Sequence, residues 1–235
     1  MPSKSRAKRR KLPWYLRPFK WLLWFAVLSV AWVLVYAVVP LPVTFTMLAD
    51  RNGITKDWTG LANIDRNMVR AVIAAEDGKF CTHNGFDREA IEQAIERNAQ
   101  GRRMRGGSTI SQQTAKNVFL WQGSGWTRYV RKVPEVWFTF LIETIWGKRR
   151  IMEVYLNVAE TGIGTYGVEA GAQRYFRKGA GKLSPAEAAR IAAILPLPKK
   201  REAVSPSGFT RRYGNMITAR IGQVRRDGLD ACVYN

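Results

Sequence analysis

The amino-acid sequence predicts a mainly α-helical domain preceded by a single transmembrane helix. Residues 21–39 hold no charged side chain and are rich in Val, Leu, Trp and Ala. From Asn67 onward, apolar residues recur mostly with helical spacing, and the sequence has no repeat, low-complexity tract or convincing run of alternating strands. Outside the apolar segment, the 235-residue chain has room for one domain.

The apolar segment predicts an uncleaved membrane anchor. About 20 residues, at about 1.5 Å each, cross a hydrocarbon core of about 30 Å. The eight Lys and Arg residues within 1–20 then place the N-terminus in the cytoplasm and the rest of the chain outside. The alternative is a cleaved signal peptide, but its apolar core usually has only about 7–15 residues, and Pro40-Leu41-Pro42 is a poor cleavage site. We expect a basic tail (1–20), a transmembrane helix (21–39), a juxtamembrane connector (40–66) and a domain (67–235).

The net charge of +20 needs a partner of opposite sign. Residues 50–235 alone hold 30 basic and 18 acidic side chains. A nucleic acid is one candidate, but a basic domain outside the membrane more plausibly meets an anionic, lipid-linked ligand. The two cysteines, Cys81 and Cys232, have the option of pairing outside the cytoplasm, yet two thiols make no disulfide framework, so free thiols are expected.

Several helices follow from spacing and capping signals. Val69, Val72, Ile73, Glu76 and Phe80 share one helical face. Asp87 is placed to cap a helix that runs to about Asn98, and residues 100–107 form a basic, glycine-bearing loop expected to be mobile. Two further helices are expected to begin with capping boxes, one near Ser108 (Thr109 and Gln112) and one at Ser184 (with Glu187) that ends before Pro196. Between them we expect a helix with Pro134 in its first turn that ends near Trp146, where Gly147–Arg150 form a stop, and another helix over 151–158.

Glu76 is the first candidate for chemistry. An acid on an apolar face is costly to bury, and burial raises its pKa towards the range useful for a base. The alternative is a structural acid at a helix end. His83 is the only histidine, which excludes a multi-histidine metal site and a Ser-His-Asp triad. The one Ser-x-x-Lys string, Ser5 to Lys8, lies in the predicted tail, so no penicillin-sensitive transpeptidase is expected.

Two further patterns suit an anionic group. Gly106-Gly107-Ser108-Thr109 leads into a helix, and a helix N-terminus offers free N–H groups and a positive dipole end. Gln113 and Lys116 follow on one face of that helix. Arg131 and Glu135 are spaced for an ion pair across one turn, which taken alone indicates an ordinary surface pair.

Taken together, these segments resemble the five signatures of family 51 glycosyltransferases. Glu76 to Asp87 resembles the first, an E-D-x-x-F-x-x-H-x-G-x-D pattern. The others are matched by Gly106 to Asn117, by Arg131 to Glu135 (R-K-x-x-E), by Ile151 to Ala170, and by Glu187 to Pro196. Ser111 stands where Thr is common. The resemblance is closest to the monofunctional biosynthetic peptidoglycan transglycosylases, since the chain stops where bifunctional penicillin-binding proteins continue.

The resemblance implies a lysozyme-like fold and an inverting polymerisation of lipid II that releases undecaprenyl diphosphate. It implies Glu76 as the catalytic base and Glu135 as the second catalytic carboxylate, with Lys116, Arg131 and the amides near Ser108 and Thr109 on the diphosphate. Supporting roles are implied for four residues: Phe80, His83, Gln113 and Asn117. No covalent cofactor is expected, and Glu135 is a candidate to orient the cations or a divalent cation (Mg²⁺ or Mn²⁺) beside the diphosphate.

The expected partners are lipid II, the growing lipid-linked strand, the bacterial inner membrane and proteins of cell division or wall synthesis, with the domain periplasmic. A lytic muramidase is the nearest alternative, but it has no need of the phosphate-handling groups. A silent scaffold that binds lipid II is a second alternative, against which intact Glu76 and Glu135 argue. A nucleic-acid binder is a third, and the outward topology argues against it.

Overall fold

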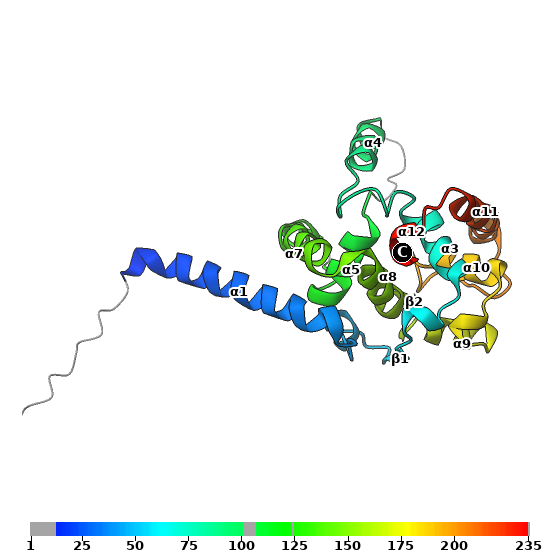
Figure 1. Cartoon of the computed structure of the whole chain (residues 1–235), viewed down its shortest axis with the longest axis horizontal. Coiled ribbons are helices and arrows are strands. Elements are labelled where there is room, and N and C mark those ends of the chain that lie inside the picture. Colours follow the sequence, from blue (N-terminus) through cyan, green and yellow to red (C-terminus); the bar gives the residue numbers. More distant parts are fainter. Residues whose placement is uncertain (1–12, 101–106, 124, 235) are drawn as a thin grey trace, which may run out of the picture.

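The computed structural model describes residues 13–100, 107–123 and 125–234. A long N-terminal helix, α1 (Arg17–Val38), follows a short 3₁₀ turn, η1 (Trp14–Leu16), and projects away from a helical domain (Figure 1). Within the described residues it is the one helix long and apolar enough to cross a membrane. The predicted anchor and mainly α fold are confirmed, with the helix beginning four residues before residue 21.

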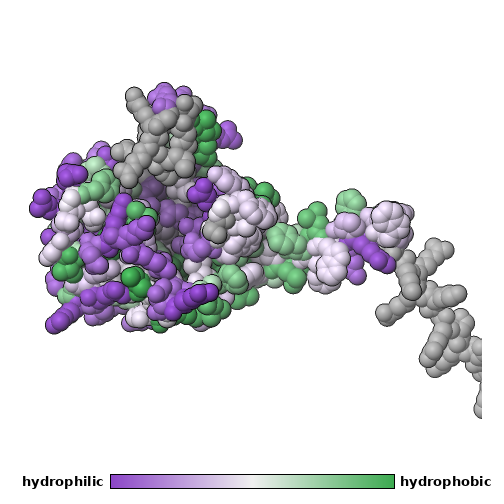
Figure 2. Space-filling model, turned by 180° about the vertical axis from the view of Figure 1, so that it is seen from behind, coloured by the Kyte–Doolittle hydropathy of each residue, from purple (hydrophilic) through white to green (hydrophobic). Residues whose placement is uncertain are grey.

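The domain-proximal half of α1 packs against α7 (Lys132–Ile145). The Trp137 indole donates a hydrogen bond to Ser29 Oγ at 2.9 Å, and the Trp146 indole donates one to the Val33 carbonyl at 2.8 Å. Hydrophobic residues, green in Figure 2, gather along α1 and where it joins the domain. The anchor is therefore docked on the domain and is not a loose tether.

The segment expected as a connector, 40–66, packs into the domain. It contains α2 (Phe45–Leu48), β1 (Thr55–Lys56) and the 3₁₀ turn η2 (Leu61–Asn63). The side chains of Leu41, Met47 and Leu61 are fully or almost fully buried in the same core as the later helices. This segment therefore contributes to the core as well as linking the domain to the anchor.

The first domain helix, α3 (Arg66–Glu76), is capped by Asp65, which accepts a hydrogen bond from the Asn67 amide at 2.7 Å. The helix ends at Glu76, so Phe80 lies beyond it in a turn and does not continue its face, contrary to the expected helical stripe. Phe80 is nonetheless fully buried. The apolar stripe of α3 thus brings Glu76 to the edge of the core.

The next helix, α4 (Arg88–Ala99), projects from the body of the domain (Figure 1). Asp87 caps it as predicted, accepting a hydrogen bond from the Ala90 amide at 3.0 Å. The expected mobile loop at residues 100–107 lies mostly outside the described residues. After it, α5 (Ile110–Phe119) begins with the predicted Thr109–Gln112 capping box.

One helix boundary differs from expectation. The short α6 (Thr127–Val130) leads into α7, which carries Pro134 in its first turn as predicted. Gly147 begins α8 (Gly147–Val158), so Lys148, Arg149 and Arg150 form the first turn of α8 and not a stop after α7. Gly147 adopts a positive φ of 68°, which redirects the chain between two helices without an intervening loop.

A small sheet was not predicted. The central strand β3 (Thr165–Tyr166) pairs in parallel with β1 and antiparallel with β2 (Glu160–Gly162). Strands of two or three residues are too short to produce an alternating pattern. Gly164, at a φ of 62° between β2 and β3, has the Asn52 carbonyl oxygen only 2.7 Å from where a Cβ would lie, so the turn requires glycine.

The C-terminal part covers α3. It consists of α9 (Val168–Phe176), the 3₁₀ turn η3 (Ala180–Lys182), α10 (Pro185–Ile194), α11 (Gly208–Arg226) and α12 (Ala231–Tyr234). The predicted capping box of Ser184 and Glu187 opens α10. Helices α10 and α11 pack against α3 and against each other, so Glu76 is enclosed from this side.

Cys81 and Cys232 form a disulfide with a Cα–Cα distance of 5.5 Å, so the expectation of free thiols was wrong. Spacing alone gave no sign of the pair, because 151 residues separate the two cysteines. The bridge fastens α12 to the turn after α3. The Arg70–Asp230 ion pair, at 2.8 Å, holds the same two segments together.

Candidate active site

Glu76 is the last residue of α3, and its two carboxylate oxygens have different surroundings. Gln113 Nε2 donates a hydrogen bond to Oε2 at 2.9 Å. Oε1 is buried and has no hydrogen-bond partner in the described part of the chain. Burial raises the pKa of Glu76 above its usual value, while the Gln113 hydrogen bond and the charge of Lys116 oppose the rise. One oxygen is therefore held and the other is available for a proton.

The residue after Glu76 ties three segments together. Asp77 Oδ2 accepts a hydrogen bond from the Ile110 amide at 3.0 Å, and Oδ1 lies 2.9 Å from His83 Nε2. The Gly85 amide donates a hydrogen bond to His83 Nδ1 at 3.1 Å, so Nδ1 is an acceptor. The ring hydrogen therefore lies on Nε2, which donates a hydrogen bond to Asp77. His83 thus positions the turn after Glu76. Asp77 was not among the predicted site residues, although it stands in the first signature.

Three amides at the N-terminus of α5, including that of Thr109, are already hydrogen-bonded within the protein and are not free for an anion. The Thr109 amide donates to Gln112 Oε1 at 3.0 Å, the Gln112 amide donates to Thr109 Oγ1, and the Ile110 amide is held by Asp77. Thr109 is buried, and its hydroxyl donates to the Gly85 carbonyl at 2.7 Å. The capping box and Asp77 therefore satisfy these three donors internally, and Thr109 supports the site from within.

The cations gather at the other end of the site. Arg131, at the N-cap of α7, donates to Glu135 Oε2 at 3.0 Å, and Lys132 Nζ donates to Oε1 at 2.5 Å. Glu135 is only 2% exposed and Arg131 only 5%, so these two form a buried ion pair and not the surface pair that their spacing alone indicates. Lys132, which is about half exposed, joins the pair from the surface. Lys132 Nζ also lies 3.4 Å from Ser108 Oγ. Lys132 was quoted in the third signature but not predicted as a site residue.

Lys116 joins the two ends. Burial lowers its pKa first, and the charge of Arg131 lowers it further, while Glu135 and Glu76 raise it. Lys116 therefore interacts electrostatically with both carboxylates, Glu76 and Glu135. Three cations (Lys116, Arg131 and Lys132) surround one carboxylate here, an excess that suits an anionic group. Arg131 also keeps one buried donor, Nε, without a hydrogen-bond partner among the described atoms.

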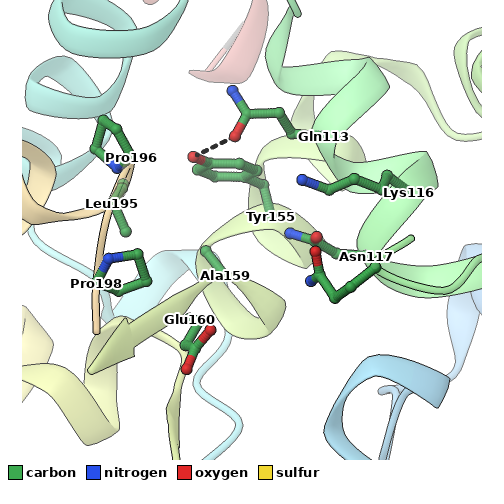
Figure 3. A pocket seen from close by; sticks show the side chains of 10 residues that line it. Gln113, Lys116, Asn117, Tyr155, Ala159, Glu160, Leu195, Pro196 and Pro198 are labelled. Carbon is green, nitrogen blue, oxygen red and sulfur yellow. Dashed lines mark hydrogen bonds between the residues drawn. The ribbon is translucent and has the colours of Figure 1, made fainter. Parts of the chain in front are cut away.

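A pocket of about 150 Å³ opens beside these residues. Figure 3 shows Gln113, Lys116 and Asn117 of α5 facing Glu160 and the segment from Leu195 to Pro198 across it. The Tyr155 hydroxyl, 3.5 Å from Gln113 Oε1, extends the hydrogen-bond chain that ends at Glu76. Sequence reasoning missed Tyr155 and Glu160 as pocket residues, although both stand in the fourth signature. Figure 2 shows a hollowed, hydrophilic face beneath α4.

The structure brings most of the predicted residues together and leaves two inside. Lys116 and Glu76 interact electrostatically, as do Lys116, Arg131 and Glu135, and Gln113 and Asn117 line the adjoining pocket. Phe80 is fully buried with Lys148 Nζ 4.6 Å above its ring, and Thr109 is buried at the start of α5. Both side chains thus support the site from the core.

A divalent cation does not fit Glu135 as it stands. Both carboxylate oxygens already accept hydrogen bonds from cationic side chains, Arg131 and Lys132. In the described ranges, no group of three or more His, Cys, Asp or Glu side chains is arranged to hold a metal.

Comparisons of the sequence with known proteins agree on one family. The family model described as "Transglycosylase" matches residues 44–221. The chain is 52% identical to a biosynthetic peptidoglycan transglycosylase of Caulobacter vibrioides over 204 residues, which cover 86% of this chain and 88% of that one. It is 46% identical to the protein of the same name from Jannaschia sp. (88% and 85% covered) and 43% identical to that from Pseudomonas aeruginosa (91% and 94% covered).

Proposed function

The chain belongs to the transglycosylase family, and we propose that it polymerises lipid II into glycan strands with Glu76 as the general base. The observation that carries this proposal is the divided environment of Glu76. Gln113 orients the carboxylate through Oε2, and Oε1 is buried with no hydrogen-bond partner in the described chain. A base needs such an oxygen, and the raised pKa of Glu76 makes its carboxylate a stronger proton acceptor than an exposed one.

In the proposed reaction, Glu76 takes the proton from the 4-hydroxyl of the acceptor GlcNAc. The freed oxygen attacks the anomeric carbon of the lipid-linked MurNAc of the growing strand. The bond from that carbon to the diphosphate breaks with its electron pair, and undecaprenyl diphosphate leaves. Because attack and departure occur on opposite faces, the configuration at the anomeric carbon inverts.

Three cationic side chains, the cation cluster, would offset the negative charge of the diphosphate leaving group. Lys116, Arg131 and Lys132 are fixed by burial or by Glu135, so they are preorganised where negative charge develops. Glu135 acts here as a positioning carboxylate, since both of its oxygens hold cations. The Nε–H of Arg131, which lacks a hydrogen-bond partner among the described atoms, is a donor that a diphosphate oxygen would satisfy.

The anchor confines the enzyme to the membrane that carries its lipid-linked substrates. We propose that the basic residues 1–20 lie in the cytoplasm and that the domain lies in the periplasm, on the strength of the positive-inside rule. Partner proteins in cell division or wall synthesis stay a prediction.

The test is polymerisation of labelled lipid II by the detergent-solubilised protein and its Glu76→Gln variant, with products resolved by size. A ladder of glycan chains from the unchanged protein alone supports the proposal. Equal ladders from both proteins would remove Glu76 from the chemical step. If neither makes polymer while both bind lipid II, a lipid-binding scaffold is the better description.

A further inference from the structure

Glu160 is a partly buried carboxylate, with 17% of its side chain exposed, that the proposed chemistry does not use. It opens β2 and lines the pocket opposite Lys116 and Asn117 (Figure 3). Its Oε1 is buried without a hydrogen-bond partner in the described chain, and Lys199 Nζ approaches it to 3.3 Å as an ion pair. Burial raises the pKa of Glu160, and Lys199 opposes that rise. Keeping an acceptor under-satisfied in this way is costly unless a ligand completes it.

The carboxylate is held in place by a network behind it. Glu160 pairs with Tyr166 in the β2–β3 ladder, and the Tyr166 hydroxyl donates to Asp50 Oδ2 at 2.7 Å. Lys199 donates to the same Asp50 oxygen at 2.9 Å while it pairs with Glu160. The strand pairing therefore fixes the backbone of Glu160, and Lys199, itself held by Asp50, fixes its side chain at the pocket wall. Such rigidity is typical of a binding residue.

The pocket is electrically divided. Lys116 brings the positive charge of the cation cluster to the α5 side, and Glu160 brings a negative charge to the opposite side. Asn117, on the α5 side, adds a neutral amide. A ligand that satisfies both sides carries an anion at one end and hydrogen-bond donors at the other. A sugar linked directly to a diphosphate has this pattern, because its hydroxyl and acetamido N–H groups lie one ring away from the phosphate.

The geometry points to Glu160 as a specificity residue that accepts a hydrogen bond from a hydroxyl or acetamido N–H of the sugar next to the diphosphate. This inference rests on the proposed function, since it takes the diphosphate to lie at Lys116. Glu160 selects the sugar and leaves the proton transfer to Glu76. An ordinary structural ion pair with Lys199 is the competing explanation, and it predicts no effect on ligand binding beyond a change in stability.

Binding is best measured in a background that cannot turn over. Labelled lipid II in detergent is titrated into the Glu76→Gln protein, with and without a second change of Glu160→Ala or the isosteric Glu160→Gln. Loss of one hydrogen bond to a charged group costs about 1.5–3 kcal/mol, so we expect the Kd to rise about tenfold or more for Glu160→Ala. The matched control is Glu202→Gln, which removes a charge from an exposed neighbouring site and should leave the Kd unchanged.

A second arm identifies the recognised group. Lipid II whose MurNAc 6-hydroxyl is replaced by hydrogen, or whose acetamido nitrogen is methylated, is bound by the same variants. If Glu160 binds the group that was modified, the modified ligand binds more weakly than lipid II to the protein that keeps Glu160. The Glu160→Ala change then causes no further loss of affinity for that ligand.

A Kd within twofold for both Glu160 variants, with unchanged melting temperatures, would overturn the inference. So would a loss of affinity that Glu202→Gln reproduces. Binding is measured without turnover, so the result for Glu160 holds even if the proposed function is wrong. Failure of the proposed function is seen in a different measurement, as the absence of polymer from the unchanged protein.

Discussion

Gln113 Nε2 donates a hydrogen bond to Glu76 Oε2 at 2.9 Å, and this contact joins the proposed general base to the helix that carries Lys116. The bond favours the ionised carboxylate, whereas burial favours the protonated form. Burial is the larger effect, so the pKa of Glu76 is raised overall. The balance between burial and this hydrogen bond sets the fraction of Glu76 that is ionised at a given pH.

Replacing Gln113 with Leu should therefore move the acid limb of the activity profile to higher pH. Without the donor, the pKa of Glu76 rises further, so a larger fraction of the base is protonated at neutral pH. We expect activity at pH 7 to fall about tenfold or more, since a hydrogen bond to a charged group is worth about 1.5–3 kcal/mol. The rate is measured from pH 5 to pH 9. Asn117→Ala is the control, because Asn117 lines the same pocket without bonding Glu76, and an unshifted limb for Gln113→Leu would contradict the assignment.

Glu76→Gln should abolish polymerisation and stabilise the fold. Loss of a general base costs about 10²–10⁴-fold in rate. An acid whose folded pKa is raised above its unfolded value destabilises the fold as pH increases from the unfolded pKa to the folded one, because the native state binds more protons in that window. Gln removes this penalty, so the melting temperature at pH 8 should rise by at least about 2 °C relative to the unchanged protein, and less at pH 4. A lower melting temperature at pH 8 would show that the buried charge is compensated.

Glu135→Gln should reduce both stability and turnover. The change leaves the buried Arg131 without its charged partner, and breaking a buried ion pair costs about 3–5 kcal/mol. Thermal unfolding and polymerisation rate are measured together. Glu89→Gln is the matched control, since Glu89 is exposed and pairs with Lys79 at the surface, where solvent screens the attraction. Equal effects of the two changes would mean that the buried Arg131–Glu135 pair contributes little.

Reduction of the Cys81–Cys232 disulfide should destabilise the domain. The bridge closes a loop across 151 residues, and such links typically contribute about 2–4 kcal/mol by restricting the unfolded chain. We expect a reductant to lower the melting temperature and to reduce activity, because Cys81 lies on the turn between Glu76 and His83. The Cys81→Ala/Cys232→Ala protein should start at the lower temperature and not respond to reductant. A response from that variant would locate the effect elsewhere.

Local signals in the sequence predicted what local interactions determine. The capping boxes at Thr109 and Ser184 and the apolar segment at 21–39 each depend on neighbours within a few residues, and the structure has all three. Pairing across distance had no such signal. The disulfide, the β1–β3 pairing of Thr55 with Thr165, and the Glu160–Lys199 contact all join residues that only the tertiary fold brings together.

The candidate site divides in the same way. Signature residues such as Glu76, Lys116 and Glu135 were found from the sequence because their order along the chain is specific. The state of the donors at Thr109 was misjudged, since a glycine-led helix start looks alike whether its amides are free or already bonded to Gln112 and Asp77. Tyr155 was missed because one tyrosine on the apolar face of an amphipathic helix is typical of a core residue.

Deleting residues 1–39 should lower activity on lipid II embedded in liposomes more than on detergent-dispersed lipid II. The deletion removes the tether that concentrates the enzyme at its substrates, and it also exposes the α7 surface that packs against Ser29 and Val33. Val43 and Phe45 stay exposed beside the anchor and are available to contact the bilayer, whereas Leu41 and Met47 are buried.

Trp137→Phe separates these two effects. It removes the hydrogen bond to Ser29 and keeps the tether, so any loss of activity should be small and equal on both substrates. The two proteins are compared by the ratio of their rates on liposomes and in detergent, with melting temperature measured in parallel. If the deletion lowers both rates by the same factor, the anchor acts through the packing of α1 on α7 and not by confining the enzyme to the membrane.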